Sequence, residues 1–206
     1  MNSLLIAFEV VLLVPLFVAT WRTSLLGLSC QGLLLGWFAL RHGFHAGAAD
    51  VLTAIDLIVV RGVLAPLALY RVMRQSNAPQ RNDVIPPNLL SWTAAAALVF
   101  VAFRFADAAV AGEEAQTLVA VSTSAFLLGL LVLSTRSGVF SQIIGALRIE
   151  NAIALFELGG EPHQESLGIR AGLLALVVLS IGMFRWYLLH LSTEESPPGA
   201  PEKVAP

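Results

Sequence analysis

The sequence predicts an all-α membrane protein built as a bundle of about seven transmembrane helices. Of its 206 residues, 57% are apolar and only 13% are charged, whereas about a quarter of the residues in a soluble domain carry charge. Long apolar runs between short polar breaks indicate helical spans rather than the alternation of an outer-membrane barrel. We therefore expect one polytopic membrane domain over residues 1–191 and a disordered, proline-rich tail over 192–206.

Seven segments reach the roughly 20 residues that a helix needs to cross a bilayer. Arg22 and Thr23 separate the first two, which predicts a tight hairpin there, and Arg136 and Ser137 do the same before the sixth. The first segment has no basic residues before it and no small-residue cleavage site, which predicts a retained helix rather than a signal peptide. The predicted spans are 4–21, 24–42, 51–73, 89–110, 116–136, 138–158 and 167–189.

The basic residues predict an N-terminus outside and a C-terminus in the cytoplasm, because cytoplasmic loops are enriched in Lys and Arg. Among the basic residues outside the spans, only Arg41 lies on the predicted outer side. This distribution fits a multi-pass protein of the inner (cytoplasmic) cell membrane, and a net charge of -2 gives no reason to expect a nucleic-acid partner. The predicted cytoplasmic side collects Arg22, Arg71, Arg74, Arg81, Arg136, Arg185 and Lys203.

The sixth predicted span carries Arg148, Glu150 and Asn151 near its middle. A charge at that depth costs roughly 3 to 10 kcal/mol and persists only beside a partner or water. Successive residues of an α-helix turn by about 100°, so Arg148 and Glu150 point about 200° apart and cannot pair with each other. Each therefore requires a counter-charge from a neighbouring helix.

The charged residues inside the other spans lie at different depths. Arg61 is near the centre of the third span, Asp56 and Arg170 lie in the outer parts of their spans, and Glu9 is about a third of the way along the first. Two interpretations stay open: buried ion pairs that hold helices in register, which add little net stability, or a proton or ion relay. We favour the relay. The candidate residues are Glu150, Arg148, Arg61, Asp56, Arg170 and Glu9.

Glu150 is the group that we expect to titrate, with Arg61 and Arg148 as counter-charges, because arginine itself stays protonated. Arg104 and Asp107 are one turn apart at the end of the fourth span, and we expect a structural ion pair there. Pro66 follows Arg61 by five residues. It is expected to leave a backbone carbonyl without its usual partner and to bend the third span.

No cofactor or metal site is expected. The single cysteine, Cys30, falls within an apolar segment, and one cysteine cannot hold an iron–sulfur centre. The four histidines lie at span ends or in loops without the spacing of metal ligands.

Three motifs, in order and over most of the chain, resemble the hydrogenase-4 component E family, a membrane subunit of formate hydrogenlyase-type complexes. They are SCQGLLL at 29–35, RGVLAPLALYR at 61–71 and QIIGALRIEN at 142–151. The last three spans also resemble the K subunit of respiratory complex I, which lies beside antiporter-like subunits and carries membrane glutamates for proton transfer. The resemblance implies that Glu150 is the component E glutamate and that Arg61 stands where that family has lysine.

The sequence departs from the family pattern at two places. Arg148 stands where the family is apolar, and Gly172 stands where it has an acid on the last helix, with Arg170 half a turn earlier. A relay with two carboxylates on adjacent helices then needs another acid, and Asp56 or Glu9 is the hypothesis.

The favoured function is a non-catalytic membrane subunit of a proton-translocating, hydrogenase-like or complex-I-like respiratory assembly. It would contribute buried charges to a proton path and bind antiporter-like and other membrane subunits besides lipid, while redox chemistry occurs on partners of a multi-subunit oxidoreductase. Two alternatives are a structural membrane adaptor without proton transfer and a small independent transporter.

Overall fold

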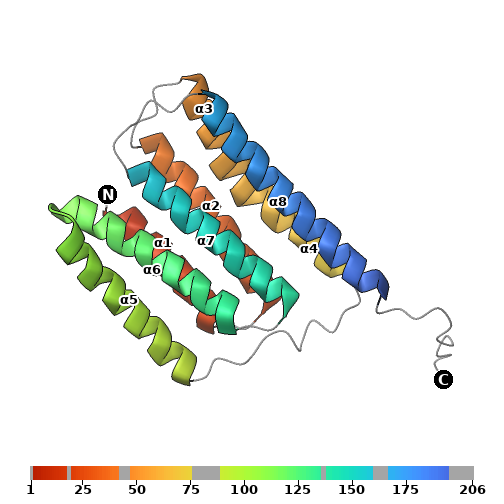
Figure 1. Cartoon of the computed structure of the whole chain (residues 1–206), viewed down its shortest axis with the longest axis horizontal. Helices are drawn as coiled ribbons and strands as arrows, with labels where there is room; N and C mark the ends of the chain where they lie inside the picture. The colour runs from red at the N-terminus through yellow and green to blue at the C-terminus, as the bar shows by residue number, and fades with distance from the viewer. Residues whose placement is uncertain are drawn as a thin grey trace.

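The computed structural model describes residues 2–17, 20–41, 47–75, 89–135, 138–159 and 167–194, and every regular element in them is a helix. Six of these helices are long and apolar enough to cross a membrane, which confirms the predicted class of helical, multi-pass membrane protein. The elements are α1 (Asn2–Phe17), α2 (Trp21–Arg41), α3 (Ala48–Ala54), the π-helical η1 (Ile55–Leu64), α4 (Ala65–Gln75), α5 (Leu89–Ala109), α6 (Glu113–Thr135), α7 (Val139–Gly159) and α8 (Leu167–Glu194) (Figure 1).

The first two helices differ from the predicted spans. α1 has 16 residues, about 24 Å at 1.5 Å per residue, which is less than the roughly 30 Å of the hydrocarbon core. α2 begins at Trp21, so Arg22 and Thr23 lie in its first turn rather than between the two helices, while α1 and α2 pack on each other as predicted for a hairpin. Thr20 caps the helix instead, because its hydroxyl oxygen accepts the backbone N–H of Thr23 at 3.3 Å.

The later helices agree with the predicted spans more closely. α6 begins three residues early, at Glu113, directly after Gly112, whose φ of +99° suits glycine. Glu113 and Glu114 then lie in the first turn, where the helix dipole favours acidic side chains. α8 runs on to Glu194, so the first three residues of the predicted tail are helical, and the rest of it lies outside the described residues, as do residues 76–88 and 136–137.

The long helices run antiparallel to their neighbours in sequence (Figure 1), and four of them pack together at the centre, where α1 and α7 each contact both α2 and α6. α5 lies outside α6. On the other side, the continuous helix formed by α3, η1 and α4 packs on α2, and α8 packs mainly on that helix. We call the end of the bundle where α1, α3, α6 and α8 begin the N-end, and the opposite end the C-end.

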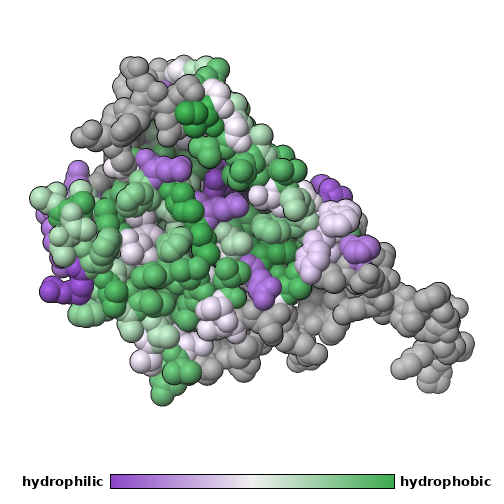
Figure 2. Space-filling model, viewed as in Figure 1, coloured by the Kyte–Doolittle hydropathy of each residue, from purple (hydrophilic) through white to green (hydrophobic). Residues whose placement is uncertain are grey.

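Small residues bring the central helices close together. A Cβ added to Gly145 of α7 would lie 3.1 Å from the backbone nitrogen of Leu133 and 3.2 Å from the carbonyl oxygen of Gly129 on α6. Much of the outer surface is apolar: Figure 2 shows mainly hydrophobic side chains on the viewed face, with a few hydrophilic ones within it. Phe100, Phe105 and Leu179 are among the exposed apolar residues of α5 and α8, and such surfaces suit lipid or a partner helix.

Candidate functional site

Asp56 and Arg61 form an ion pair within one helix, with 2.9 Å between the Arg61 Nε and an Asp56 carboxylate oxygen. Five residues in an α-helix would place them about 140° apart. The segment η1 (Ile55–Leu64) is π-helical, and its hydrogen bonds join residues five apart, which brings both side chains to one face. Only 12% and 17% of the two side chains is exposed. Arg61 therefore finds its counter-charge on its own helix.

The pair is held against α2 by a close approach of two backbones. A Cβ on Gly32 of α2 would lie 2.5 Å from the backbone nitrogen of Gly62. At this contact the Ser29 hydroxyl donates a hydrogen bond of 2.5 Å to the Gly62 carbonyl. Ser29 thus joins the Gly62 carbonyl of η1 to α2.

Two amides continue the polar contacts from Arg61 into the central bundle. The Arg61 Nη1 donates to the side-chain oxygen of Asn151 on α7 at 3.4 Å. The Asn151 amide donates in turn to the side-chain oxygen of Gln31 on α2 at 3.5 Å. Both amide residues are buried, with exposed fractions of 2% and 0%. A polar connection therefore runs from Asp56 through Arg61 and Asn151 to Gln31.

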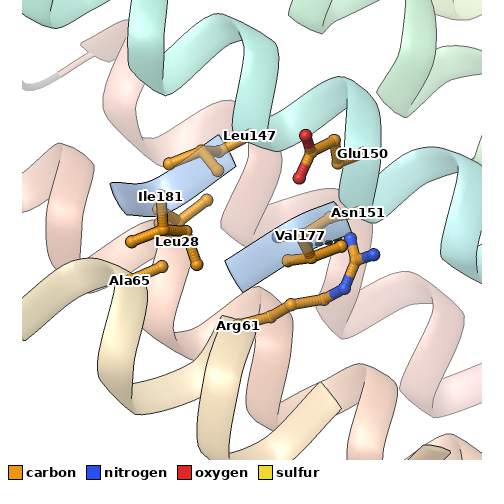
Figure 3. Close-up of a pocket in the computed structure, with 8 residues that line it drawn as sticks. All are labelled: Leu28, Arg61, Ala65, Leu147, Glu150, Asn151, Val177 and Ile181. Carbon is orange, nitrogen blue, oxygen red and sulfur yellow. Dashed lines mark hydrogen bonds between the residues drawn. The ribbon is translucent and has the colours of Figure 1, made fainter. Parts of the chain in front are cut away.

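Glu150 lines a small cavity of about 10 Å³ beside this connection, which is about the space that one water molecule requires. Its Oε2 is buried and has no hydrogen-bond partner among the described residues. Figure 3 shows the carboxylate of Glu150 on the same side of the cavity as Asn151 and the Arg61 guanidinium. The apolar lining residues are Leu28, Ala65, Leu147, Val177 and Ile181.

Glu150 therefore lies near the Asp56–Arg61 ion pair without a direct ion pair of its own. The charges of Arg61 and Asp56 act on its carboxylate electrostatically, but no described basic group lies within salt-bridge distance of it. Arg61 pairs directly with Asp56, and its charge also acts on Glu150, so its role as a counter-charge of Glu150 stays a prediction. The Glu150 carboxylate has an oxygen without a hydrogen-bond partner among the described residues and lies near the Arg61 guanidinium. Such a carboxylate can bind a water molecule and exchange a proton with it.

Arg148 does not line the cavity. Its side chain is only 2% exposed, and its Nε and Nη2 have no hydrogen-bond partner among the described residues. The residue lies two positions before Glu150, so it points to another face of α7, as predicted. The described carboxylates all lie beyond salt-bridge distance of it, and its expected role as a counter-charge to Glu150 stays a prediction.

Glu9 lies apart from the cavity, in the contact between α1 and α6. The Ser124 hydroxyl donates to its Oε2 at 2.6 Å, while its Oε1 is buried without a hydrogen-bond partner among the described residues. Glu9 lies halfway along α1 rather than a third of the way along a longer span, because α1 ends at Phe17.

The two remaining sets of predicted residues lie near the N-end. Arg170 of α8 donates a hydrogen bond to the hydroxyl of Thr53 on α3. Arg104 and Asp107 form the expected i, i+3 ion pair on α5, 3.6 Å apart, with 69% and 55% of their side chains exposed. That pair faces away from the bundle and from the site.

Several polar residues share one depth in the bundle. Arg61 lies midway between Ala48 and Arg74, Gln31 is the middle residue of α2, and Ser124 is the middle residue of α6. Glu150 and Arg148 flank the midpoint of α7. The polar groups thus form a layer across the bundle, roughly in the mid-plane of any membrane that the helices span, with Asp56 and Arg170 displaced toward the N-end.

Apart from Asn151, sequence reasoning missed the uncharged polar residues at this depth. Gln31, Ser29 and Ser124 each interrupt an apolar span near its centre, and that position is the signal by which they can be found. Among the described residues, no group of three His, Cys, Asp or Glu side chains is arranged to hold a metal ion. Comparisons with protein-family models, with curated proteins and with solved structures each found no match to this chain.

Proposed function

We propose that this chain is a non-catalytic membrane subunit of a proton-translocating respiratory assembly of the hydrogenase-like or complex-I-like kind. The observation that carries the proposal is the polar layer at mid-depth. Helices α2, η1, α6 and α7 contribute to it, and in it the Glu150 carboxylate has an oxygen without a hydrogen-bond partner among the described residues, at a water-sized cavity. Buried ionisable groups at that depth are costly and typically mark ion or proton pathways.

The layer runs across the bundle rather than from one membrane face to the other. Such an arrangement suits lateral exchange with neighbouring membrane subunits, because a path in the membrane plane must continue into a partner. The apolar, largely exposed helices α5 and α8 offer surfaces on which antiporter-like subunits or lipid would pack. Redox chemistry is assigned to partner subunits.

The orientation belongs to the same proposal. Of the arginines at or near the ends of the spans, Arg22, Arg71, Arg74 and Arg185 lie toward the C-end and Arg41 toward the N-end, while Arg104 and Arg170, also toward the N-end, fall within predicted spans. Because cytoplasmic segments are enriched in Lys and Arg, we place the C-end in the cytoplasm, the N-end outside, and the protein in the inner cell membrane.

The test is ion translocation by the assembled complex in sealed membrane vesicles, comparing the wild type with Glu150→Gln. A native gel establishes that the amount of assembled complex is unchanged, and Glu157→Gln, on the same helix but outside the cavity, is the matched control. We expect loss of translocation with Glu150→Gln alone. Unchanged translocation in an intact complex would contradict the proposal.

A structural membrane adaptor is the second candidate function. The Asp56–Arg61 pair and the amide contacts of Asn151 and Gln31 join η1, α7 and α2, which is what a packing role requires. In that case Glu150→Gln leaves translocation intact, whereas Asn151→Leu reduces the amount of assembled complex on the native gel.

A further inference from the structure

The seam between the helix α3–η1–α4 and α8 is polar in one half and apolar in the other. In the half nearer the N-end, Thr53 accepts the hydrogen bond of Arg170, and Asp56 follows Thr53 by three residues, so both lie on neighbouring turns of one face. Asp56 pairs with Arg61 at mid-depth. Polar side chains therefore occupy successive turns from the beginning of α8 to the cavity of Glu150.

The half nearer the C-end contains an apolar cluster. α4 contributes Leu69 and Val72 to it, and α8 contributes Ile181 and Leu188, all at most 9% exposed. The same cluster includes buried residues of α2 and α7, among them Leu25 and Phe140. Water entering this half would lose hydrogen bonds without gaining any from the protein.

The cavity of Glu150 lies at the boundary of the two halves. Its polar side consists of Arg61, Glu150 and Asn151, and the apolar residues on its other side include Leu147 and Ile181 (Figure 3). Two buried carboxylate oxygens along the polar half, Asp56 Oδ1 and Glu150 Oε2, have no hydrogen-bond partner among the described residues. Such atoms are the usual ligands of internal water, which makes two to four hydrogen bonds at a polar site.

We propose that the seam admits water, and with it protons, from the N-end of the bundle to Glu150, and that the apolar cluster closes it toward the C-end. A proton that arrives at Glu150 then continues laterally, toward Asn151 and the polar layer, and does not cross the membrane within this subunit. The inference rests on the proposed function for the role of Glu150 as proton acceptor. The one-sided access of water is a property of the bundle itself.

Thiol labelling tests the access without reference to transport. In a full-length Cys30→Ala background, single cysteines are placed at Thr53 and Asp56 in the polar half, and at Leu69 in the apolar half of the same helix. Glu113→Cys and Arg71→Cys, both exposed, mark the N-end and C-end faces. A charged, membrane-impermeant maleimide is added to membrane vesicles of each orientation, because only a thiol that water reaches can ionise and react.

We expect Thr53→Cys and Asp56→Cys to react from the face that labels Glu113→Cys, at least about tenfold faster than Leu69→Cys, which should react from neither face. Labelling of Leu69→Cys at a similar rate, or labelling of the polar positions only from the face of Arg71→Cys, would overturn the proposal. If either Thr53→Cys or Asp56→Cys fails to accumulate in membranes, the other variant decides the outcome. A thiol at that remaining position that reacts from neither face would also overturn the proposal.

The labelling and the translocation assay fail independently. Labelled Thr53→Cys together with normal translocation by Glu150→Gln would remove the transport function while leaving the one-sided access in place. If the polar positions are unreactive but Glu150→Gln abolishes translocation, the transport function stands and the one-sided access of water is overturned, because protons must then reach Glu150 by another route.

Discussion

Gly32 of α2 and Gly62 of η1 lie in direct backbone contact. A Cβ on Gly32 would be 2.5 Å from the nitrogen and 2.6 Å from the Cα of Gly62, closer than atoms approach without displacement. The contact brings Ser29 to the Gly62 carbonyl and lies beside Gln31, which reaches Asn151. The geometry around the cavity of Glu150 therefore depends on two residues that have no side chain.

Gly32→Ala should lower the stability of the protein, because the added methyl group must push α2 and η1 apart. Overpacking of this kind costs about 1 to 3 kcal/mol, which appears as a lower midpoint of thermal unfolding in detergent. Gly182→Ala is the matched control, since nothing lies within 4 Å of its Cβ and alanine is the better helix former. An equal midpoint for Gly32→Ala and the wild type would contradict the close contact.

Asp56→Leu should destabilise the protein by about 3 to 5 kcal/mol, because it leaves the Arg61 guanidinium buried without its counter-charge. The double variant Asp56→Leu/Arg61→Met should recover most of that loss, since an apolar pair of similar volume replaces the ion pair. Chemical or thermal unfolding of the purified chain measures both.

The exposed pair on α5 supplies the control for this cycle. Asp107→Leu removes the partner of Arg104, but more than half of each side chain is exposed, so the change should stay within about 1 kcal/mol. If Asp56→Leu were as mild as Asp107→Leu, the ion pair in η1 would not be the contact that the structure gives.

Ser29→Ala should cost about 1 kcal/mol, the usual net value of one hydrogen bond, because the Gly62 carbonyl loses its donor. The loss should appear as a lower midpoint of thermal unfolding in detergent. An unchanged midpoint would mean that the Gly62 carbonyl does not depend on the Ser29 hydroxyl.

Arg148→Met should leave the isolated chain as stable as the wild type or stabilise it by about 1 to 4 kcal/mol, because it removes a buried guanidinium whose Nε and Nη2 have no partner among the described residues. Arg148→Lys keeps the charge and should bring no such gain. A clear loss of stability with Arg148→Met in the isolated chain would show that the guanidinium has a stabilising partner.

The apolar lengths in the sequence predicted most of the fold. A run of about 20 apolar residues has few structures open to it other than a membrane helix, so the beginning of α5 at Leu89 and of α8 at Leu167 agree with the predicted spans. The errors lie where local capping decides the boundary, as at Thr20. The depth of Arg61, Arg148 and Glu150 was also predictable, since depth follows from position within a span.

The sequence by itself thus determined the class of protein, most of its long apolar helices and the depth of Arg61, Arg148 and Glu150. Only the tertiary structure decided which of those residues meet. A change from α-helical to π-helical turns moved Arg61 onto the face of Asp56, and the contact of Gly32 with Gly62 fixed which sides of α2 and η1 face each other. Partners follow from helix rotation and helix type, which depend on packing against every neighbour rather than on spacing along one helix.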